Sequence, residues 1–207
     1  MKQGKFITFE GCEGAGKSTQ AGLLAGMLAS NGMKTILTRE PGGTPLGEEI
    51  SRLLKWGKIG DIDALSELLL FNASRAELVF TVIEPALKAG KIVICDRFTD
   101  SSLVYQGGGR GLSTETVIRV NDIATRGLKP DMTILLDIPI STGQHRKSNS
   151  VADRFEQEAD EFHKSVRQSY LALAEADPER WKVVNGTLSR SEVTEAVWKH
   201  VKALLEI

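Results

Sequence analysis

Cysteine is scarce in this sequence: the 207 residues include two, Cys12 and Cys95. Two cysteines so far apart exclude a disulfide-rich secreted scaffold, and a chain of this length can bury a core without disulfides. Both residues fit as small packing side chains. We therefore expect a reducing, cytoplasmic environment.

Charge imbalance and long apolar runs are also missing. The formal net charge is −1, so nothing indicates the basic surface that holds extended nucleic acid. Apolar runs such as FITF, KIVIC and MTILLDI are far shorter than the ~20 residues that cross a bilayer. No signal-peptide pattern is evident. We expect a small-molecule partner, without nucleic acid or membrane.

Short apolar runs alternate with helical patterns along the chain. Five runs are typical of buried parallel strands: FITFE, KTILTRE, KIVICD, MTILLDI and KVVNG. Their alternation with helices predicts an α/β fold, a five-stranded parallel sheet with helices on both faces and ligands at the carboxyl ends of the strands. The longest helical segment, 61–90, carries Pro85, where we expect a kink. No linker is evident, so we expect one domain over residues 1–207, with a short mobile lid at about 141–155.

The strongest motif is GCEGAGKS, residues 11–18, directly after the first predicted strand. It fits G-x-x-x-x-G-K-[ST], in which backbone N–H groups surround phosphate oxygens, a lysine reaches the β- and γ-phosphates, and a hydroxyl binds Mg²⁺. Gly11, Gly14 and Gly16 would form the turn, with Lys17 as the cation and Ser18 as the metal ligand. A bound phosphate would sit at the N-terminus of the helix that follows. An ordinary glycine-rich turn is the alternative.

Charged residues follow three other predicted strands: Arg39 and Glu40, Asp96 and Arg97, and Asp137. Asp96 follows four apolar residues, a pattern typical of a carboxylate that holds Mg²⁺ in phosphate-loop enzymes, although a structural carboxylate is the alternative. A guanidinium binds phosphate oxygens with two parallel hydrogen bonds, which favours Arg97 as a phosphate ligand. A surface ion pair with Glu40 is its alternative.

Several signatures of other enzyme classes are missing. The sequence has no N-K-x-D or D-x-x-G motif, no evident nucleophile with a histidine partner, and no metal-ligand spacing among its three histidines. A phosphate monoester would need no general base as acceptor, because it is already an anion at neutral pH. Cations must then converge on the transfer site, and Lys17, Arg97, Arg146 and Arg154 are suited to this.

Motifs along nearly the whole chain resemble those of bacterial thymidylate kinases. They are FEGCEGAGKST, TREPGGTPLGEEI, LLFNASRA, CDRFTDSSLVYQGGGRG, PDMTILLDIP and DRFEQE. REPGG followed by YQGGGRG is far more specific than the phosphate loop alone. The resemblance implies the phosphate-loop nucleoside-monophosphate-kinase fold, transfer of the γ-phosphoryl group of Mg·ATP to dTMP, and a homodimer.

The resemblance also implies roles for individual residues. The catalytic set would be Lys17, Asp96, Arg97, Arg146 and Arg154. ATP and Mg²⁺ would be bound by Gly11, Cys12, Glu13, Gly14, Ala15, Gly16, Lys17, Ser18 and Thr19, with Ser18 and Asp96 as metal ligands. The acceptor would be bound by Glu13, Glu40, Pro41, Arg52, Phe71, Arg75, Arg97, Ser102, Tyr105 and Gln106.

Within the acceptor set, Phe71 would stack on thymine and Arg75 would hydrogen-bond the base. Their i, i+4 spacing places both on one helix face. From the residues alone, Phe71 also fits as a core residue and Arg75 as a solvated one. Glu13 would lie near the 3′-hydroxyl, and Tyr105 would close on the sugar. Ser102 and Gln106 would complete the base contacts.

This chain departs from the family pattern at one position, and its phosphate loop and lid are of a kind that varies within the family. The family usually has an arginine for the acceptor phosphate where this chain has Ser51, and an arginine follows one residue later as Arg52. On a helix this shift rotates the side chain by about 100°. Either Arg52 reaches the phosphate from a shifted helix or the contact is lost. The phosphate loop has no arginine, which is similar to the subgroup whose lid supplies basic residues; Lys147 would share that role or be solvated.

Two other functions stay open from the sequence. One is a kinase for another nucleoside monophosphate on the same fold. The other is a nucleotide-binding switch that hydrolyses ATP slowly, against which the paired charges at the strand ends argue.

Overall fold

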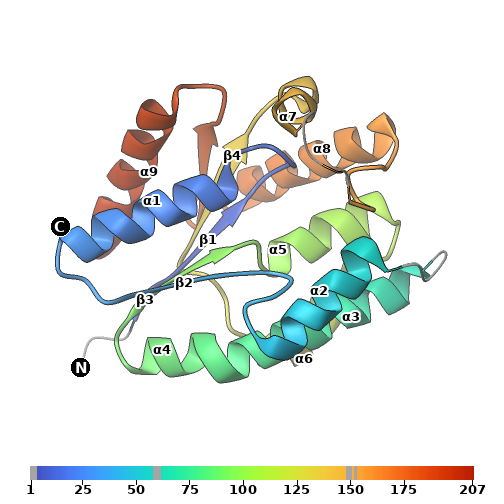
Figure 1. The fold of residues 1–207 in the computed structure, drawn as a ribbon, viewed down its shortest axis with the longest axis horizontal. Coiled ribbons are helices and arrows are strands. Elements are labelled where there is room, and N and C mark those ends of the chain that lie inside the picture. The colour runs from blue at the N-terminus through green and yellow to red at the C-terminus, as the bar shows by residue number, and fades with distance from the viewer. Residues whose placement is uncertain (1–3, 58–61, 148–150, 152) are drawn as a thin grey trace.

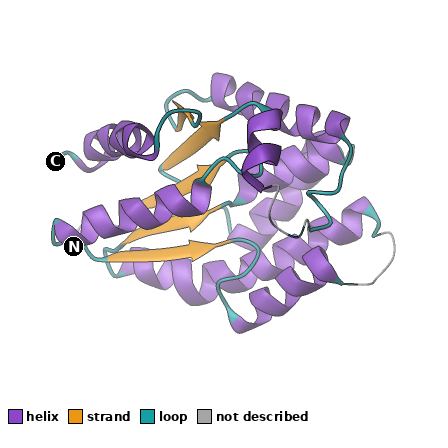
Figure 2. Cartoon of the chain, turned by 45° about the horizontal axis from the view of Figure 1, so that its top comes forward, coloured by secondary structure: helices purple, strands orange, loops and turns teal. Residues whose placement is uncertain are grey.

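The computed structural model describes residues 4–57, 62–147, 151 and 153–207. In these residues one five-stranded parallel sheet forms the centre of the fold, with strand order β2-β3-β1-β4-β5 (Figures 1 and 2). The strands are β1 (Phe6–Glu10), β2 (Thr35–Arg39), β3 (Ile92–Asp96), β4 (Met132–Asp137) and β5 (Trp181–Asn185). The predicted parallel sheet is therefore confirmed. Because β1 lies between β3 and β4, the loop after it opens at the centre of the carboxyl edge.

Helical segments connect the strands. They are α1 (Lys17–Ser30), α2 (Pro45–Trp56), α3 (Ala64–Leu78), the π-helical η1 (Val79–Ile83), α4 (Glu84–Lys88), α5 (Thr99–Ser102), the π-helical η2 (Leu103–Gly109), α6 (Thr114–Thr125), α7 (Ile140–Lys147), α8 (Asp160–Ala176) and α9 (Arg190–Leu205). Among the described residues, no helix is both long enough and apolar enough to span a bilayer.

The alternation of side chains along β1 creates two cores. Ile7 and Phe9 point to one face, where they pack with the apolar stripes of α1 and α9. Phe6 points to the other face, into a cluster with α3, η1 and α4. A further cluster forms where α8 and η2 pack against β4. Helices thus cover both faces, as Figure 1 shows.

The long helical segment changes its geometry before Pro85. The α-helix ends at Leu78, a π-helical turn follows, and α4 begins at Glu84. Proline lacks an N–H group and crowds the preceding turn, so it is tolerated in the first turn of a new helical segment. The kink expected at this proline takes the form of that π-helical turn.

The stretch predicted as a lid is partly helical. Residues 140–147 form α7, which lies over the start of α1 and beside α8 (Figure 1). Residues 148–150 and 152 of the expected lid lie outside the described residues. Gly143 of α7 packs so closely on the backbone of Glu13 that no side chain would fit there. The lid helix therefore rests directly on the loop after β1.

Candidate active site

A cavity of about 720 Å³ opens at the carboxyl ends of the central strands. One end is walled by the loop after β1 and the start of α9, and the other by α2, α3 and η2. Sequence-predicted residues that line it are Glu13, Gly14, Ala15, Gly16, Lys17, Ser18, Thr19, Glu40, Pro41, Phe71, Asp96, Arg97, Ser102, Tyr105, Gln106 and Arg146. Gly11, Cys12, Arg52, Arg75 and Arg154 are not among the lining residues.

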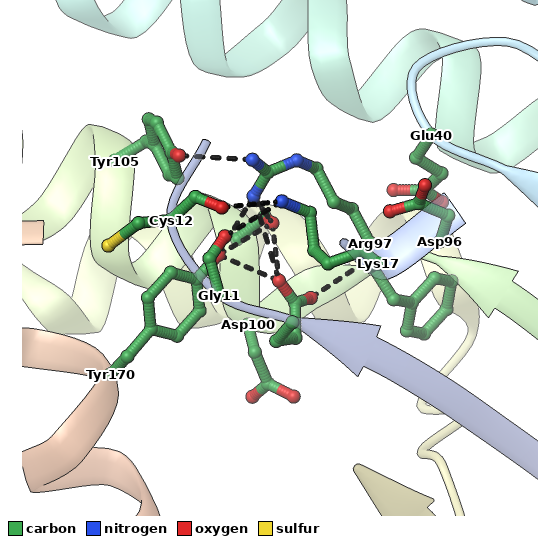
Figure 3. Close-up of polar contacts among 12 residues, drawn as sticks. Gly11, Cys12, Lys17, Glu40, Asp96, Arg97, Asp100, Tyr105 and Tyr170 are labelled. Carbon is green, nitrogen blue, oxygen red and sulfur yellow. Dashed lines mark hydrogen bonds and ion pairs between the residues drawn. The ribbon is translucent and has the colours of Figure 1, made fainter. Parts of the chain in front are cut away.

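The loop at residues 11–16 is shaped for phosphate. Gly11, Gly14 and Gly16 have φ values of 138°, 73° and 94°, which side-chain-bearing residues rarely adopt. The Lys17 ammonium folds back onto the loop and donates to the carbonyls of Gly11 at 3.0 Å and Cys12 at 2.8 Å (Figure 3). Burial lowers the pKa of Lys17. A buried cation beside open backbone N–H groups is a phosphate-binding arrangement.

Ser18 and Asp96 meet beside this loop. The Ser18 hydroxyl, in the first turn of α1, donates to the carboxylate of Asp96 at the end of β3. Magnesium binds oxygen ligands and keeps several waters and phosphate oxygens in its coordination shell, so two protein oxygens suffice. The described residues contain no cluster of three or more acidic, histidine or cysteine side chains that would suit a different metal site. The pair therefore fits Mg²⁺ held mainly by a nucleotide.

Arg97 occupies the centre of the cavity. Its guanidinium donates to Glu13 at 2.5 Å, to the hydroxyls of Tyr105 and Tyr170 at 3.1 Å each, and to Ser101 at 3.2 Å; Figure 3 shows it reaching from β3 toward Tyr105. Its φ is 70°, an uncommon conformation for a residue other than glycine, and such strain is frequent at functional sites. The guanidinium is held in position before any ligand arrives.

Glu10 lies next to Arg97 and helps to hold the hydrogen-bond network around it. It is fully buried at the end of β1 and accepts from the backbone N–H of Phe98 and from the hydroxyls of Ser101 and Tyr170, at 2.7 to 2.8 Å. Burial raises its pKa, and Arg97, 3.9 Å away, opposes this. For Glu13, burial acts in the same direction but is outweighed by Arg97 and Lys17, so its pKa is lowered. Glu13 is thus an anion.

The other end of the cavity, called the slot below, is lined by Phe71, Phe155, Ser102 and Gln106. Phe71 lines it, with the ring of Phe155 tilted against it at a centroid distance of 5.6 Å. Ser102 and Gln106 are polar groups in the same wall. The amide nitrogen of Gln106 donates to Glu67 at 2.7 Å, which leaves the amide oxygen as the group available to a ligand. The predicted base contacts therefore come together, and Phe155 joins them.

Arg75 lies beneath this slot. It is 1% exposed and donates to Glu40, Asn72, Asn121, Ser102 and the carbonyl of Phe98, at distances of 2.7 to 3.1 Å. All three of its nitrogens are engaged by the protein. A direct hydrogen bond to a base would require one of these bonds to be exchanged, whereas its present contact holds Ser102 in the wall.

Glu40 is the partner of Arg75 and precedes a cis peptide bond to Pro41. Its Oε2 accepts from Arg75, while its buried Oε1 has no hydrogen-bond partner among the residues that the structure describes. Burial raises the pKa of Glu40 to about 7 and Arg75 counteracts only part of this effect. The carboxyl group therefore titrates near neutral pH.

The structure answers the question that Ser51 and Arg52 pose. Ser51 is buried on the inner face of α2, whereas the Arg52 side chain is 70% exposed and pairs with Glu49 at 2.8 Å. Arg52 does not reach the cavity. Lys55, one helical turn after Ser51, lines it instead.

The two predicted lid arginines lie in different places. Arg146 of α7 lines the cavity and donates to the carbonyls of Gly14 at 3.3 Å and Gly186 at 3.0 Å. Arg154 turns away from the cavity, donates to the carbonyl of Leu54 at 3.0 Å and pairs with the buried Glu67 at 2.5 Å. Lys147, which pairs with Glu156, also lines the cavity.

The remaining charges at the strand ends have protein partners. Arg39 lines the cavity and pairs with Glu48 at 2.8 Å. Asp137 is bound by the fork of Arg167, with bonds of 2.7 and 2.8 Å, and does not line the cavity. Asp137 is thus a structural carboxylate, while Asp96 faces the cavity.

Comparisons with known proteins agree with one another. The family model for thymidylate kinase matches residues 9–197. The thymidylate kinase of Dehalococcoides mccartyi is 50% identical over 202 residues, covering 98% of each chain. That of Thermomicrobium roseum is 49% identical over 203 residues, covering 97% of this chain and 96% of the relative. The crystal structure of thymidylate kinase from Ehrlichia chaffeensis superposes with a TM-score of 0.78 at 36% identity, over 97% of this chain and 99% of that one.

Proposed function

The chain belongs to the thymidylate kinase family, and we propose that it transfers the γ-phosphoryl group of ATP to dTMP, giving dTDP and ADP. One observation carries the proposal beyond the family assignment: a single cavity is lined by the phosphate loop, by the Arg97 guanidinium and by the aromatic and polar side chains of the slot. Phosphoryl transfer needs little beyond this, because catalysis consists mainly of positioning and of stabilising negative charge.

Different residues along the cavity bind different parts of the two substrates. The loop N–H groups and Lys17 would hold the ATP phosphates, and Ser18 and Asp96 would hold the Mg²⁺ that accompanies ATP. That ion, when bound, neutralises charge on the β- and γ-phosphates. Arg97 attracts the acceptor phosphate to the transferring group, which offsets the repulsion between two polyanions. Glu13, fixed by Arg97, would face the sugar, and Gln106 would accept from the N3–H of thymine.

Measurement of ADP release with and without dTMP tests the proposal. We expect turnover to depend on dTMP and to be much slower with dCMP, whose N3 carries no hydrogen for Gln106. ADP release that is independent of any nucleoside monophosphate would indicate an ATPase switch. Faster turnover with a different monophosphate would indicate a kinase of another specificity.

Replacing Phe71 with alanine is expected to weaken binding of dTMP and dUMP equally, by about 10- to 100-fold. An aromatic ring stacks on the face of any base, so its loss costs about 1–3 kcal/mol without changing the preference between the two. The measurement is KM for dTMP, dUMP and ATP. An equal rise in the KM for ATP would show that Phe71 only maintains the fold, through its contact with Phe155.

Replacing Arg146 with alanine is expected to lower kcat about 10- to 100-fold, with a smaller change in the KM for dTMP. A lid cation that stabilises charge in transfer acts mainly in the transition state. We infer a smaller effect on kcat for Arg154→Ala, because that side chain is bound to Glu67. Steady-state kinetics of both variants decide this. A raised KM at unchanged kcat for Arg146→Ala would assign that residue to acceptor binding instead.

We propose a homodimer formed through the outer faces of α2, α3 and α6. These helices carry large exposed apolar side chains: Leu46, Trp56, Leu65, Leu69, Ile118 and Ile123. Ile123 is 81% exposed, and α3 packs between α2 and α6, so the side chains belong to neighbouring elements. Apolar groups gathered on one side of a soluble protein commonly form an interface. Sedimentation equilibrium tests this, and a monomer at micromolar concentration would contradict it.

A further inference from the structure

Positive side chains line the cavity along its whole length, and most of them already have partners. Lys17 and Arg146 bind loop carbonyls, Arg97 binds Glu13, and Arg39 binds Glu48. Lys55 and Arg190 differ: within the described part of the chain neither side chain forms a hydrogen bond or an ion pair, although both line the cavity, and Arg190 lies at the start of α9, at the phosphate-loop end. Such a cation is available to an anionic ligand.

Helix geometry explains why α2 presents Lys55 and not its neighbours. Ser51 is buried on the inner face, and a residue four positions later lies on the same face one turn further along. Arg52 projects into solvent toward Glu49. The helix is held in this orientation because the N–H of Arg154 and its side chain bind the carbonyls of Lys55 and Leu54 at 3.3 and 3.0 Å.

Lys55 belongs to the acceptor end of the cavity. It contributes, after Arg97, Lys17 and Lys147, to the positive field that keeps the pKa of Glu13 low against the effect of burial. Glu13 contacts both Arg97 and Tyr105. An anion placed at the Arg97 guanidinium is therefore within the electrostatic reach of Lys55.

We propose that the Lys55 ammonium binds the 5′-phosphate of the acceptor nucleotide together with Arg97, the role that the sequence suggested for Arg52. The inference rests on the proposed function, because it assigns the acceptor end to a nucleoside monophosphate. A lysine suits this place since its flexible stem brings a point charge to the phosphate. It binds with one ammonium where an arginine would bind with a fork.

The test compares dTMP with thymidine, which lacks the phosphate. We expect Lys55→Gln to raise the Kd of dTMP about 10- to 100-fold, as for loss of a hydrogen bond between charged groups, and to leave the Kd of thymidine unchanged. The KM for dTMP should rise in parallel, and the KM for ATP should not. Lys55→Arg, which keeps the charge, should retain most of the dTMP affinity. Lys88→Gln removes an exposed lysine of α4 and should change none of these values.

Each other outcome has a distinct meaning. Equal losses for dTMP and thymidine would show that Lys55 only supports the slot, and unchanged binding of both would also overturn the inference. A phosphate-dependent loss in Arg52→Gln but not in Lys55→Gln would return the role to Arg52. If the wild-type protein released no ADP in the presence of dTMP, the proposed function itself would fail. An active wild type with an unaffected Lys55→Gln variant would refute only the present inference.

Discussion

Replacing Lys17 with methionine is expected to lower kcat by about 10³-fold or more while the protein stays folded. Its ammonium is the cation nearest the loop carbonyls of Gly11 and Cys12, and charge placed at a transferring phosphoryl group accounts for several orders of magnitude in rate. Methionine has a similar length and no charge. Burial already lowers the pKa of Lys17, so an uncharged side chain at this position costs the fold little.

The measurements are kcat with saturating ATP and dTMP and the midpoint of urea unfolding. Lys88→Met, on the exposed surface of α4, is the matched control and should change neither. A folded Lys17→Met variant that kept more than about a tenth of the wild-type kcat would refute the assignment of the loop.

The sheet was predictable because each of its strands follows from a local sequence pattern. Four of the strands form within the apolar runs that predicted them, β5 begins at Trp181, one residue before its run, and α1 begins at the lysine of the phosphate loop. Parallel strands buried on both faces need uninterrupted apolar runs, and these are easily recognised. The π-helical turn before Pro85 was not predictable in form, because proline only requires that the regular helix be interrupted somewhere before it.

The phosphate loop was also recognisable as a local pattern, since its residues are contiguous. The acceptor half was not, because it depends on distant partners. Arg75 pairs with Glu40, which lies 35 residues away in the sequence. No sequence spacing predicts that this carboxylate lies beneath the slot. Glu67 contacts Gln106, Arg110 and Arg154, which come from two separate segments. The only sequence signal for a special role of Glu67 was its position within an apolar helical stretch.

Arg52 and Lys55 are a second example of side chains whose placement does not follow from the sequence alone. The sequence establishes that they lie about 60° apart around one helix, but the rotation of the helix decides which of them meets the cavity. That rotation is set by the burial of Ser51 and Leu54 and by the contact of Arg154 with the end of α2. Arg154, predicted as a catalytic group, is in this arrangement a residue that fixes α2.

The second large effect is expected at Arg97. Replacing it with lysine should lower kcat/KM for dTMP by about 10³-fold, because lysine keeps the charge but cannot bind Glu13, Tyr105, Ser101 and Tyr170 at once while facing a phosphate. The unusual backbone conformation at this position is equally unfavourable for both residues. The measurement is kcat/KM, with the unfolding midpoint as the control for folding. A variant that kept more than about a tenth of the wild-type value would show that the fork is unnecessary.

Arg97→Met removes the charge as well. The pH dependence of its stability shows how much the charge of Arg97 contributes to the fold. In the wild type Arg97 opposes the raised pKa of Glu10 and lowers that of Glu13, so it stabilises the ionised form of both. The Arg97 cation stabilises these carboxyl groups only when they are ionised. Because the pKa of Glu13 is lowered, the part of the loss of unfolding free energy in Arg97→Met that comes from Glu13 is already present at pH 5, whereas the part that comes from Glu10 should grow as the pH rises through the raised pKa of that group. Urea unfolding at about pH 5 and pH 8 measures this difference. A loss that is the same at both pH values would mean that Glu10 does not depend on the charge of Arg97.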